Sequence, residues 1–152
     1  MIGLLQRVSS ASVTVAGETI AVIGGGLLVL VAVEKGDAAA QAQRLAERLL
    51  AYRVFEDEGG RMNRDVREAQ GSVLLVPQFT LAATTDRGNR PSFSAAAEPA
   101  AGRELFELLV REMATRFPRV SMGRFGANMA VSLVNDGPVT FWLRVAPEAA
   151  QA

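Results

Sequence analysis

The first half of the chain alternates between short apolar runs and turn residues. β-Branched residues with partial polar alternation are typical of strands, and glycine-rich breaks separate these runs. The run that follows Gly24-Gly25-Gly26 is continuously apolar, which favours a strand buried on both faces. A similar run ends at Pro77. We therefore predict strands at 4–8, 12–15, 19–23, 27–33 and 73–76.

Two segments carry the period of a helix. In the first, 38–53, apolar residues recur every three or four positions, and Asp37 is placed to cap its start. The second, 99–116, begins at a proline and is stopped by Phe117-Pro118. Its period places Leu108 and Leu109 on the buried side.

The C-terminal part predicts two more strands, 129–134 and 139–145, joined by an Asn-Asp-Gly-Pro corner. Asp-Gly alone would close a tight hairpin, but Pro138 removes a backbone N–H and permits a cis bond. Such a corner can act as a recognition element as well as a connection.

The order of strands, helix, strand, helix and strands predicts an α/β protein with mixed sheets and two main helices packed on one side. With no repeat, no low-complexity segment and no linker, residues 1–152 are expected to form one domain, with a frayed tail after about residue 146.

Composition narrows the chemistry. The formal net charge is zero, which disfavours a strongly basic, non-specific nucleic-acid binder. Histidine and cysteine are both absent, so Ser-His-Asp and Cys-His machinery, disulfides and the usual metal ligands are excluded. We therefore expect no bound metal and a cytoplasmic protein. We also expect no signal peptide, and no membrane span because no apolar stretch is long enough to cross a bilayer.

One candidate site is the end of the second buried strand, Pro77-Gln78-Phe79-Thr80-Leu81. Gln78 offers a donor and an acceptor, Thr80 a hydroxyl, and the N–H groups of Phe79 and Thr80 are potential oxyanion donors. The alternative is an ordinary strand end with a capping threonine.

Two further segments invite a functional interpretation. Arg87 and Arg90 lie in a long irregular segment and could bind phosphate groups, with Phe93 as a surface on which a base stacks. The alternative is a solvent-exposed loop without a binding role. Phe125 and Met129 could form a flat slot for a base, or could belong to the core.

Several motifs together resemble the D-aminoacyl-tRNA deacylase family of the bacterial type, the D-tyrosyl-tRNA(Tyr) deacylases. They are Pro77-Gln78-Phe79-Thr80-Leu81, Arg90-Pro91-Ser92-Phe93 and Asn135-Asp136-Gly137-Pro138-Val139-Thr140. The likeness also includes the opening residues 5–13 and covers nearly the whole chain.

The resemblance implies a three-layer α/β fold that forms a homodimer and uses no cofactor. Gly137-Pro138 is implied to be a Gly-cisPro motif that enters the partner subunit's active site and rejects L-amino acids by steric exclusion. D-amino acids and glycine would pass this filter. Arg7 is implied to hold the motif in place.

The resemblance also implies the other roles. Gln78, Phe79 and Thr80 would line the pocket, with the N–H of Phe79 stabilising the oxyanion. Phe125 and Met129 would hold the 3′ terminal adenosine of the aminoacylated tRNA, whose 2′-hydroxyl would assist the attack.

Two positions depart from the family pattern. Pro77 stands where serine is usual, which excludes a serine nucleophile there, and Asn128 stands where aspartate is frequent.

The leading hypothesis is hydrolysis of D-aminoacyl-tRNA and of mischarged glycyl-tRNA. The alternatives are a non-catalytic nucleic-acid-binding module on the same fold and a small-molecule esterase.

Overall fold

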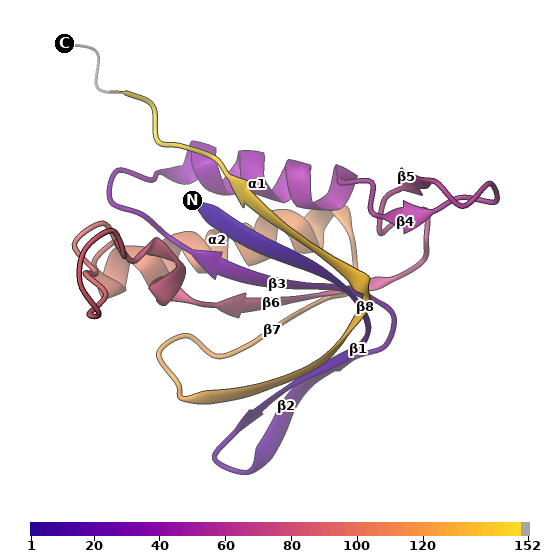
Figure 1. Ribbon diagram of the computed structural model, residues 1–152, viewed down its shortest axis with the longest axis horizontal. Helices are drawn as coiled ribbons and strands as arrows, with labels where there is room; N and C mark the ends of the chain where they lie inside the picture. Colours follow the sequence, from indigo (N-terminus) through magenta and orange to yellow (C-terminus); the bar gives the residue numbers. More distant parts are fainter. Residues whose placement is uncertain (150–152) are drawn as a thin grey trace.

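The computed structural model describes residues 1–149 and contains one strongly curved six-stranded sheet with two helices on one face (Figure 1). The sheet strands are β1 (Ile2–Val15), β2 (Glu18–Ile23), β3 (Gly26–Ala32), β6 (Ser72–Pro77), β7 (Val120–Met122) and β8 (Met129–Arg144). The remaining elements are α1 (Ala39–Ala51), α2 (Pro99–Arg116), the short 3₁₀ helix η1 (Phe79–Ala82), and a separate hairpin of β4 (Phe55–Glu56) and β5 (Met62–Arg64).

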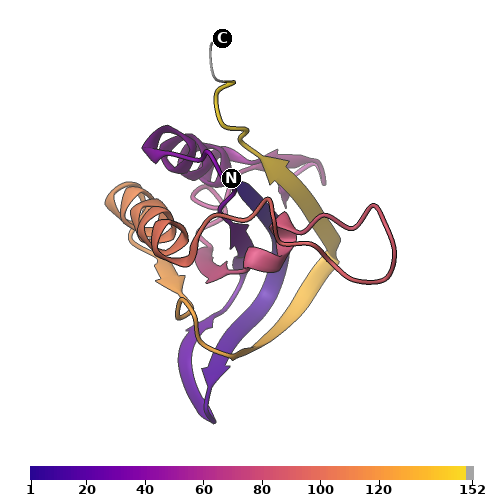
Figure 2. The same cartoon turned by 90° about the vertical axis from the view of Figure 1, so that its left-hand side faces the viewer.

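β1 organises the sheet because it pairs antiparallel with three strands. Its first half lies between β3 and β8, and its second half lies between β2 and β8. β3, β6 and β7 then continue the sheet in parallel. These pairings confirm the predicted mixed sheet, and Figure 2 shows the two helices next to each other on one side of it.

The structure corrects two strand predictions. The segments 4–8 and 12–15 are parts of the single strand β1, and 129–134 and 139–145 are parts of the single strand β8. The predicted corner at residues 135–138 is therefore a bulge inside β8 and does not reverse the chain. Both halves of β8 pair with β1, and this long-range pairing keeps the strand continuous across the Gly-Pro step.

α1 buries the predicted face, including Ala42, Leu45 and Leu49. Asp37 does not cap it. The cap is Ala38, whose N–H donates to the Gln41 side chain at 2.8 Å. The Asp37 carboxylate instead accepts hydrogen bonds from the Met1 amine and from the Glu34 N–H, each at 2.7 Å.

α2 has the predicted bounds but is rotated relative to the predicted buried face. Its buried residues are Gly102, Phe106, Leu109 and Met113, whereas Leu108 is only half-buried. The buried face therefore includes a glycine and a phenylalanine that lie next to the functional site described below.

Two hydrophobic clusters stabilise the two faces of the sheet. The larger lies between the helices and the sheet and includes Leu45, Leu49, Phe106 and Leu109. The second lies inside the curve of the sheet, where β2 approaches β6 and β7. The sheet is thus nearly closed, with apolar side chains on both of its faces.

Charged groups join the start of β1 to the end of β8. The Met1 amine donates to Glu34 at 3.2 Å and to the Val145 carbonyl at 2.7 Å, and Arg144 donates to both Glu34 oxygens at 2.9 and 3.0 Å. Burial alone would raise the pKa of Glu34. The Arg144 hydrogen bonds and the positive Met1 amine outweigh burial, so the pKa lies below its ordinary value.

Residues 145–149 form neither helix nor strand, and the rest of the tail predicted to fray lies outside the described residues. No helix in the described part of the chain is long and apolar enough to cross a membrane.

Candidate active site

The end of β6 forms the centre of the site. Pro77 is its last residue, and the Gln78 N–H extends the pairing with β3 by donating to the Val31 carbonyl at 2.7 Å. η1 begins directly afterwards, and its first hydrogen bond is donated by the Leu81 N–H to the Gln78 carbonyl at 3.2 Å. The N–H groups of Phe79 and Thr80 precede that bond, so the helix itself gives them no acceptor.

The side chains at this strand end are partly exposed. The Gln78 amide donates to the Thr80 hydroxyl. The Phe79 side chain is 57% exposed, and its ring lies 5.1 Å from that of Phe93, with the ring planes tilted by 58°. Phe93 is exposed as well, so the two rings form an apolar pair at the surface beside the strand end.

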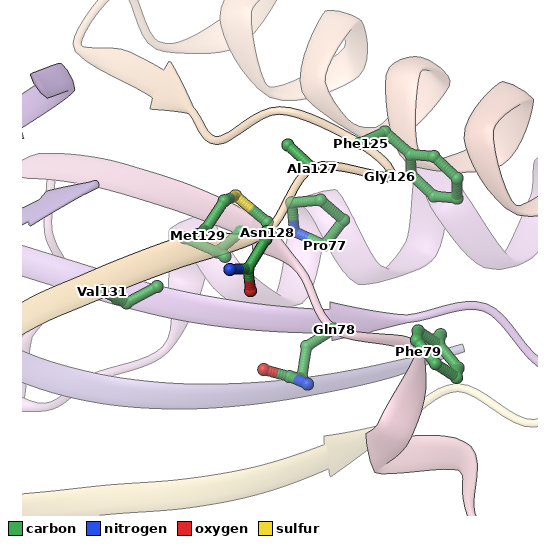
Figure 3. Close-up of a pocket in the computed structure, with 10 residues that line it drawn as sticks. Pro77, Gln78, Phe79, Phe125, Gly126, Ala127, Asn128, Met129 and Val131 are labelled. Atoms are coloured by element: carbon green, nitrogen blue, oxygen red, sulfur yellow. The ribbon is translucent and has the colours of Figure 1, made fainter. Parts of the chain in front are cut away.

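A cavity of about 320 Å³ opens between the end of β6 and the segment that leads into β8 (Figure 3). Among its lining residues are Gln78 and Phe79 on one side and Phe125 and Met129 on the other. None of the lining residues is ionisable: they are Val76, Pro77, Gln78, Phe79, Phe125, Gly126, Ala127, Asn128, Met129 and Val131. No lining side chain can therefore serve as a carboxylate, lysine or histidine base at neutral pH.

The first turns of α2 position Phe125. A Cβ on Gly102 would lie 3.4 Å from Phe125 Cζ, so the bare glycine lets the ring approach the helix. The Phe106 ring lies 6.3 Å away, and the Arg103 guanidinium lies 5.2 Å from the Phe125 ring centroid. The cation–π contact is worth about 0.5–1 kcal/mol at an exposed position.

Met129 is held by contacts with the segment before β8. The Arg124 N–H donates to its sulfur at 3.4 Å. A Cβ on Gly123 would lie only 2.8 Å from that sulfur, so the thioether packs directly against the bare glycine. Phe125 and Met129 are thus half-buried at the edge of the core, with part of each side chain facing the cavity.

Pro77 helps to open this cavity. β6 and β7 pair in parallel, and the Gly123 N–H still donates to the Leu75 carbonyl at 2.8 Å. The next bond of such a ladder would be donated by the N–H of residue 77, which proline lacks. The pairing ends here, and the segment from Gly123 diverges from β6 to form the far wall of the cavity.

Gly137 and Pro138 lie in the bulge of β8, outside this cavity, and the peptide bond between them is cis. Gly137 has φ +128°, and a Cβ there would lie 2.7 Å from Val139 Cγ2 and 3.1 Å from Arg7 Nη2. Only glycine therefore fits at position 137 without displacement of its neighbours.

Arg7 fixes the bulge from behind. The residue is only 9% exposed. Its Nη1 donates a hydrogen bond to the Val54 carbonyl at 2.7 Å, and its Nε donates one to the Asp136 carbonyl at 3.2 Å. Its Nε also lies 3.5 Å from the Asp136 carboxylate. One side chain thus connects β1, the segment before β4 and the bulge.

Asn135 was missed by the sequence analysis. Its side-chain oxygen accepts from the Val139 N–H at 3.2 Å, and its amide donates to the Thr140 hydroxyl at 2.9 Å. The side chain therefore spans the Gly-Pro step. Asparagine commonly bonds to nearby backbone in this way, so its position just before Asp-Gly-Pro was an available signal.

The structure therefore brings Gln78, Phe79, Phe125 and Met129 to one cavity, and Thr80 next to it through Gln78. It leaves Gly137, Pro138 and Arg7 elsewhere on the same chain. Arg87 and Arg90 lie in the exposed loop after η1 and do not line the cavity.

The fold and the cavity together define an α/β protein with a small cavity at the end of a buried strand, lined by aromatic, thioether and amide side chains and by no ionisable group. A sequence model of the D-Tyr-tRNA(Tyr) deacylase family matches residues 4–144. The chain belongs to this family.

Individual relatives agree with this assignment. A protein of Nitrosococcus oceani named D-aminoacyl-tRNA deacylase is 57% identical over 97% of this chain and 95% of its own length. One of Thioalkalivibrio sulfidiphilus with the same name is 60% identical over 97% of this chain and 99% of its own length. Relatives with this name are hydrolases.

Solved structures share the fold. A structure described as the c-Myc DNA unwinding element binding protein matches with a TM-score of 0.92 and 35% identity, over 96% of this chain and 99% of its own. A structure of a probable eukaryotic D-amino acid tRNA deacylase matches in fold with a TM-score of 0.81 and 16% identity, over 93% and 97% of the two chains.

Proposed function

We propose that this protein hydrolyses the ester bond of D-aminoacyl-tRNA, and of mischarged glycyl-tRNA, to release the amino acid and the tRNA. Membership of the family supports the reaction. The observation that carries the proposal for this chain is the cavity itself, whose lining lacks any ionisable side chain but adjoins two N–H groups at the start of η1.

In this proposal the terminal adenine lies in the slot between Phe125 and Met129. An aromatic ring and a thioether both give favourable contacts to a flat base. The two side chains are already held in place, by Gly102 and Arg103 in one case and by Arg124 in the other. The slot is therefore largely formed before the substrate arrives.

The reacting ester would lie against Gln78, Phe79 and Thr80. A water molecule attacks the carbonyl carbon, and the N–H of Phe79, with that of Thr80, stabilises the oxyanion that develops. The C–O bond to the ribose then breaks, and the departing oxygen takes a proton. The family resemblance implies that the 2′-hydroxyl of the terminal ribose assists the attack, and a cavity lining without an ionisable side chain is consistent with that role. No cofactor or metal is required.

We propose that the chirality filter comes from a second copy of the chain. Val131 lines the cavity, and Gly137 follows six residues later on the same strand, which is about 20 Å along β8. This separation keeps the bulge out of its own cavity. In the proposal, as the family resemblance implies, the Gly137-Pro138 bulge of a partner completes the cavity of each chain in a homodimer.

The surface of β8 supports this arrangement. Val134 and Trp142 are each 56% exposed, on either side of the bulge, and Leu133 is 36% exposed. Apolar side chains of this size gathered on one strand are characteristic of a protein–protein contact. A second copy that covers them would bring its own bulge into the interface.

The filter acts by exclusion. The main-chain carbonyls of the bulge would lie close to the substrate α-carbon, where an L-side chain would collide with them and a D-side chain would point away. Glycine, which has no side chain, would pass. The bare Gly137 leaves the bulge narrow enough to enter the cavity, and Arg7 and Asn135 keep it rigid.

The proposal also includes the three-layer arrangement and the cytoplasmic location that the family resemblance implies. The three layers would be the helices, the β3–β6 wall of the sheet, and the arm of β1, β2 and β8 that curves over it. The protein would act in the cytoplasm, where aminoacyl-tRNA is made and used.

The experiment compares Phe79→Ala with Phe79→Pro on D-Tyr-tRNA under single-turnover conditions. Both variants lose the ring, but only the proline variant loses the N–H of residue 79. Removal of one oxyanion donor costs about 10²–10³ in rate, so Phe79→Pro should be slower than Phe79→Ala by that factor. Thr80→Ala, which keeps its N–H, should be affected only moderately.

L-Tyr-tRNA and Gly-tRNA complete the test. The wild-type protein should release glycine and D-tyrosine and leave L-tyrosine attached. If D-Tyr-tRNA stays intact, or if both enantiomers are cleaved alike, the proposal fails. Cleavage of D-aminoacyl esters without tRNA would point to the small-molecule esterase instead.

A non-catalytic nucleic-acid-binding module is the second candidate. The observation in its favour is Pro77, which removes a hydroxyl and an N–H from the strand end, together with the exposed loop that carries Arg87 and Arg90. Binding of tRNA that weakens with salt, without release of any amino acid, would establish it.

A further inference from the structure

A second cavity shares Phe125 with the proposed adenine slot. It has a volume of about 290 Å³ and lies where α2 packs beside β7. Its lining includes Arg103 and Glu107 from α2, Met122 at the end of β7, and Arg124 and Phe125. Phe125 lines both cavities, so the two are neighbours that share this ring as part of their walls.

The two arginines of this cavity are free to bind an anion. Within residues 1–149 neither guanidinium lies within 4.0 Å of a carboxylate, whereas Arg44, Arg67 and Arg144 all form ion pairs. Arg103 lies over the Phe125 ring, with Nη2 3.8 Å from where a Cβ on Gly126 would be. The Arg103 guanidinium therefore lies close to Phe125 and Gly126, where the two cavities meet.

The chemistry of the lining matches one nucleotide unit. Two arginines and Glu107 leave a net positive charge, and guanidinium groups bind phosphate oxygens in a bidentate manner. Met122, whose side chain is 48% exposed, offers an apolar surface beside the charges. A phosphate site next to a polarisable apolar side chain suits a nucleotide, whose base can pack against the thioether.

We propose that this second cavity binds the phosphodiester group and the nucleotide that precede the terminal adenosine of the tRNA, with Arg103 and Arg124 on the phosphate. The inference rests on the proposed function, because it takes the terminal adenine to lie between Phe125 and Met129. The RNA strand then leaves the active site across Phe125 toward α2, and the amino acid lies at the opposite end, against Phe79.

The test measures binding of a fluorescent RNA tetranucleotide, 5′-ACCA-3′, by anisotropy, so that it does not depend on catalysis. The variants are Arg103→Ala, Arg124→Ala and the double variant. The matched control is Arg44→Ala, which removes the same charge from α1 at a position that lines neither of these two cavities and that, among residues 1–149, pairs with Glu47 alone. Unfolding in urea verifies that all four variants are folded.

Each cavity substitution should weaken binding about ten- to a hundredfold, as expected for the loss of a hydrogen bond to a charged group. The control should bind like the wild type. The slope of log K against log salt should fall by about 0.7 in the double variant, because one phosphate contact is lost. Unchanged affinity in the double variant would overturn the proposal.

A second RNA identifies the phosphate. A methylphosphonate at the last linkage makes that one group neutral. The wild type should bind this RNA more weakly than the unmodified one, and the double variant should not distinguish the two. If the double variant still loses affinity with the modified RNA, the arginines bind another part of the strand. Equal competition by inorganic phosphate and by the RNA would show a simple anion site and would likewise overturn the assignment.

These outcomes are separable from those of the proposed function. A wild-type protein that binds 5′-ACCA-3′ through Arg103 and Arg124 but leaves D-Tyr-tRNA intact would retain this site and lose the enzymatic proposal. If the double variant releases D-tyrosine from D-Tyr-tRNA at subsaturating protein as fast as the wild type, the enzymatic proposal stands and the site is refuted.

Discussion

Replacement of Gly137 by alanine tests how tightly the bulge of β8 is built. Gly137 has φ +128°, and an added Cβ would lie 2.7 Å from Val139 Cγ2 and 3.1 Å from Arg7 Nη2. The backbone conformation alone costs a residue with a Cβ about 1–2 kcal/mol. Overpacking against Val139 and the buried Arg7 adds about 1–3 kcal/mol. We therefore expect Gly137→Ala to lower the free energy of unfolding by about 2–5 kcal/mol.

Gly17→Ala is the matched control. Gly17 also has a positive φ, +81°, but no atom lies within 4 Å of its would-be Cβ. This variant should lose only the conformational part, about 1–2 kcal/mol. Both should be measured by urea unfolding at one protein concentration, because subunit association would contribute to stability.

The comparison isolates the contacts around the bulge. If Gly137→Ala is no less stable than Gly17→Ala, the bulge yields to the new methyl group, and the rigidity that we attribute to Arg7 and Asn135 is refuted. In the proposed function the same variant should also lose activity on D-Tyr-tRNA, whereas Gly17→Ala should retain it.

Three further predictions concern stability. Gly26→Ala should cost more than about 3 kcal/mol in urea unfolding, since its Cβ would lie 1.9 Å from the Ser72 carbonyl oxygen; wild-type stability would refute the close approach. Glu34→Gln should lower stability at pH 7 by about 1–2 kcal/mol through loss of the Arg144 bonds. Because folding lowers the pKa of Glu34 from 4.5, its contribution is present above about pH 4.5 and is lost as pH falls further, so wild type and variant should converge in acid. Arg7→Gln should cost about 2–4 kcal/mol by the same measurement, because two backbone carbonyls lose a charged donor.

Local signals in the sequence predicted the elements that end at strong breakers. α2 has the expected bounds because Pro99 fits a first helical turn and Phe117-Pro118 stops the helix. The corner at residues 135–138 was misread, because continuity of β8 is decided by its pairing with β1. Such pairing links residues more than a hundred positions apart, and no local pattern contains it.

The candidate site, too, has parts that the local sequence predicted and parts that only long-range contacts determine. The strand end at Gln78 and Phe79 was visible from the buried run before it, but its meeting with Phe125 and Met129 came only from the family resemblance. Arg103 was missed altogether. An arginine on a helix surface is ordinary in sequence, and only the packing of Phe125 against Gly102 gives it a functional position.

The place of β8 in the sheet bears on how the protein folds during synthesis. β1 pairs along almost its whole length with β8, from Ile2 opposite Arg144 to Val15 opposite Met129. β1 therefore leaves the ribosome long before β8, and the edge of β1 that pairs with β8 stays unpaired meanwhile. We expect this topology to make folding slow, with the sheet completed only after β8 has been synthesised.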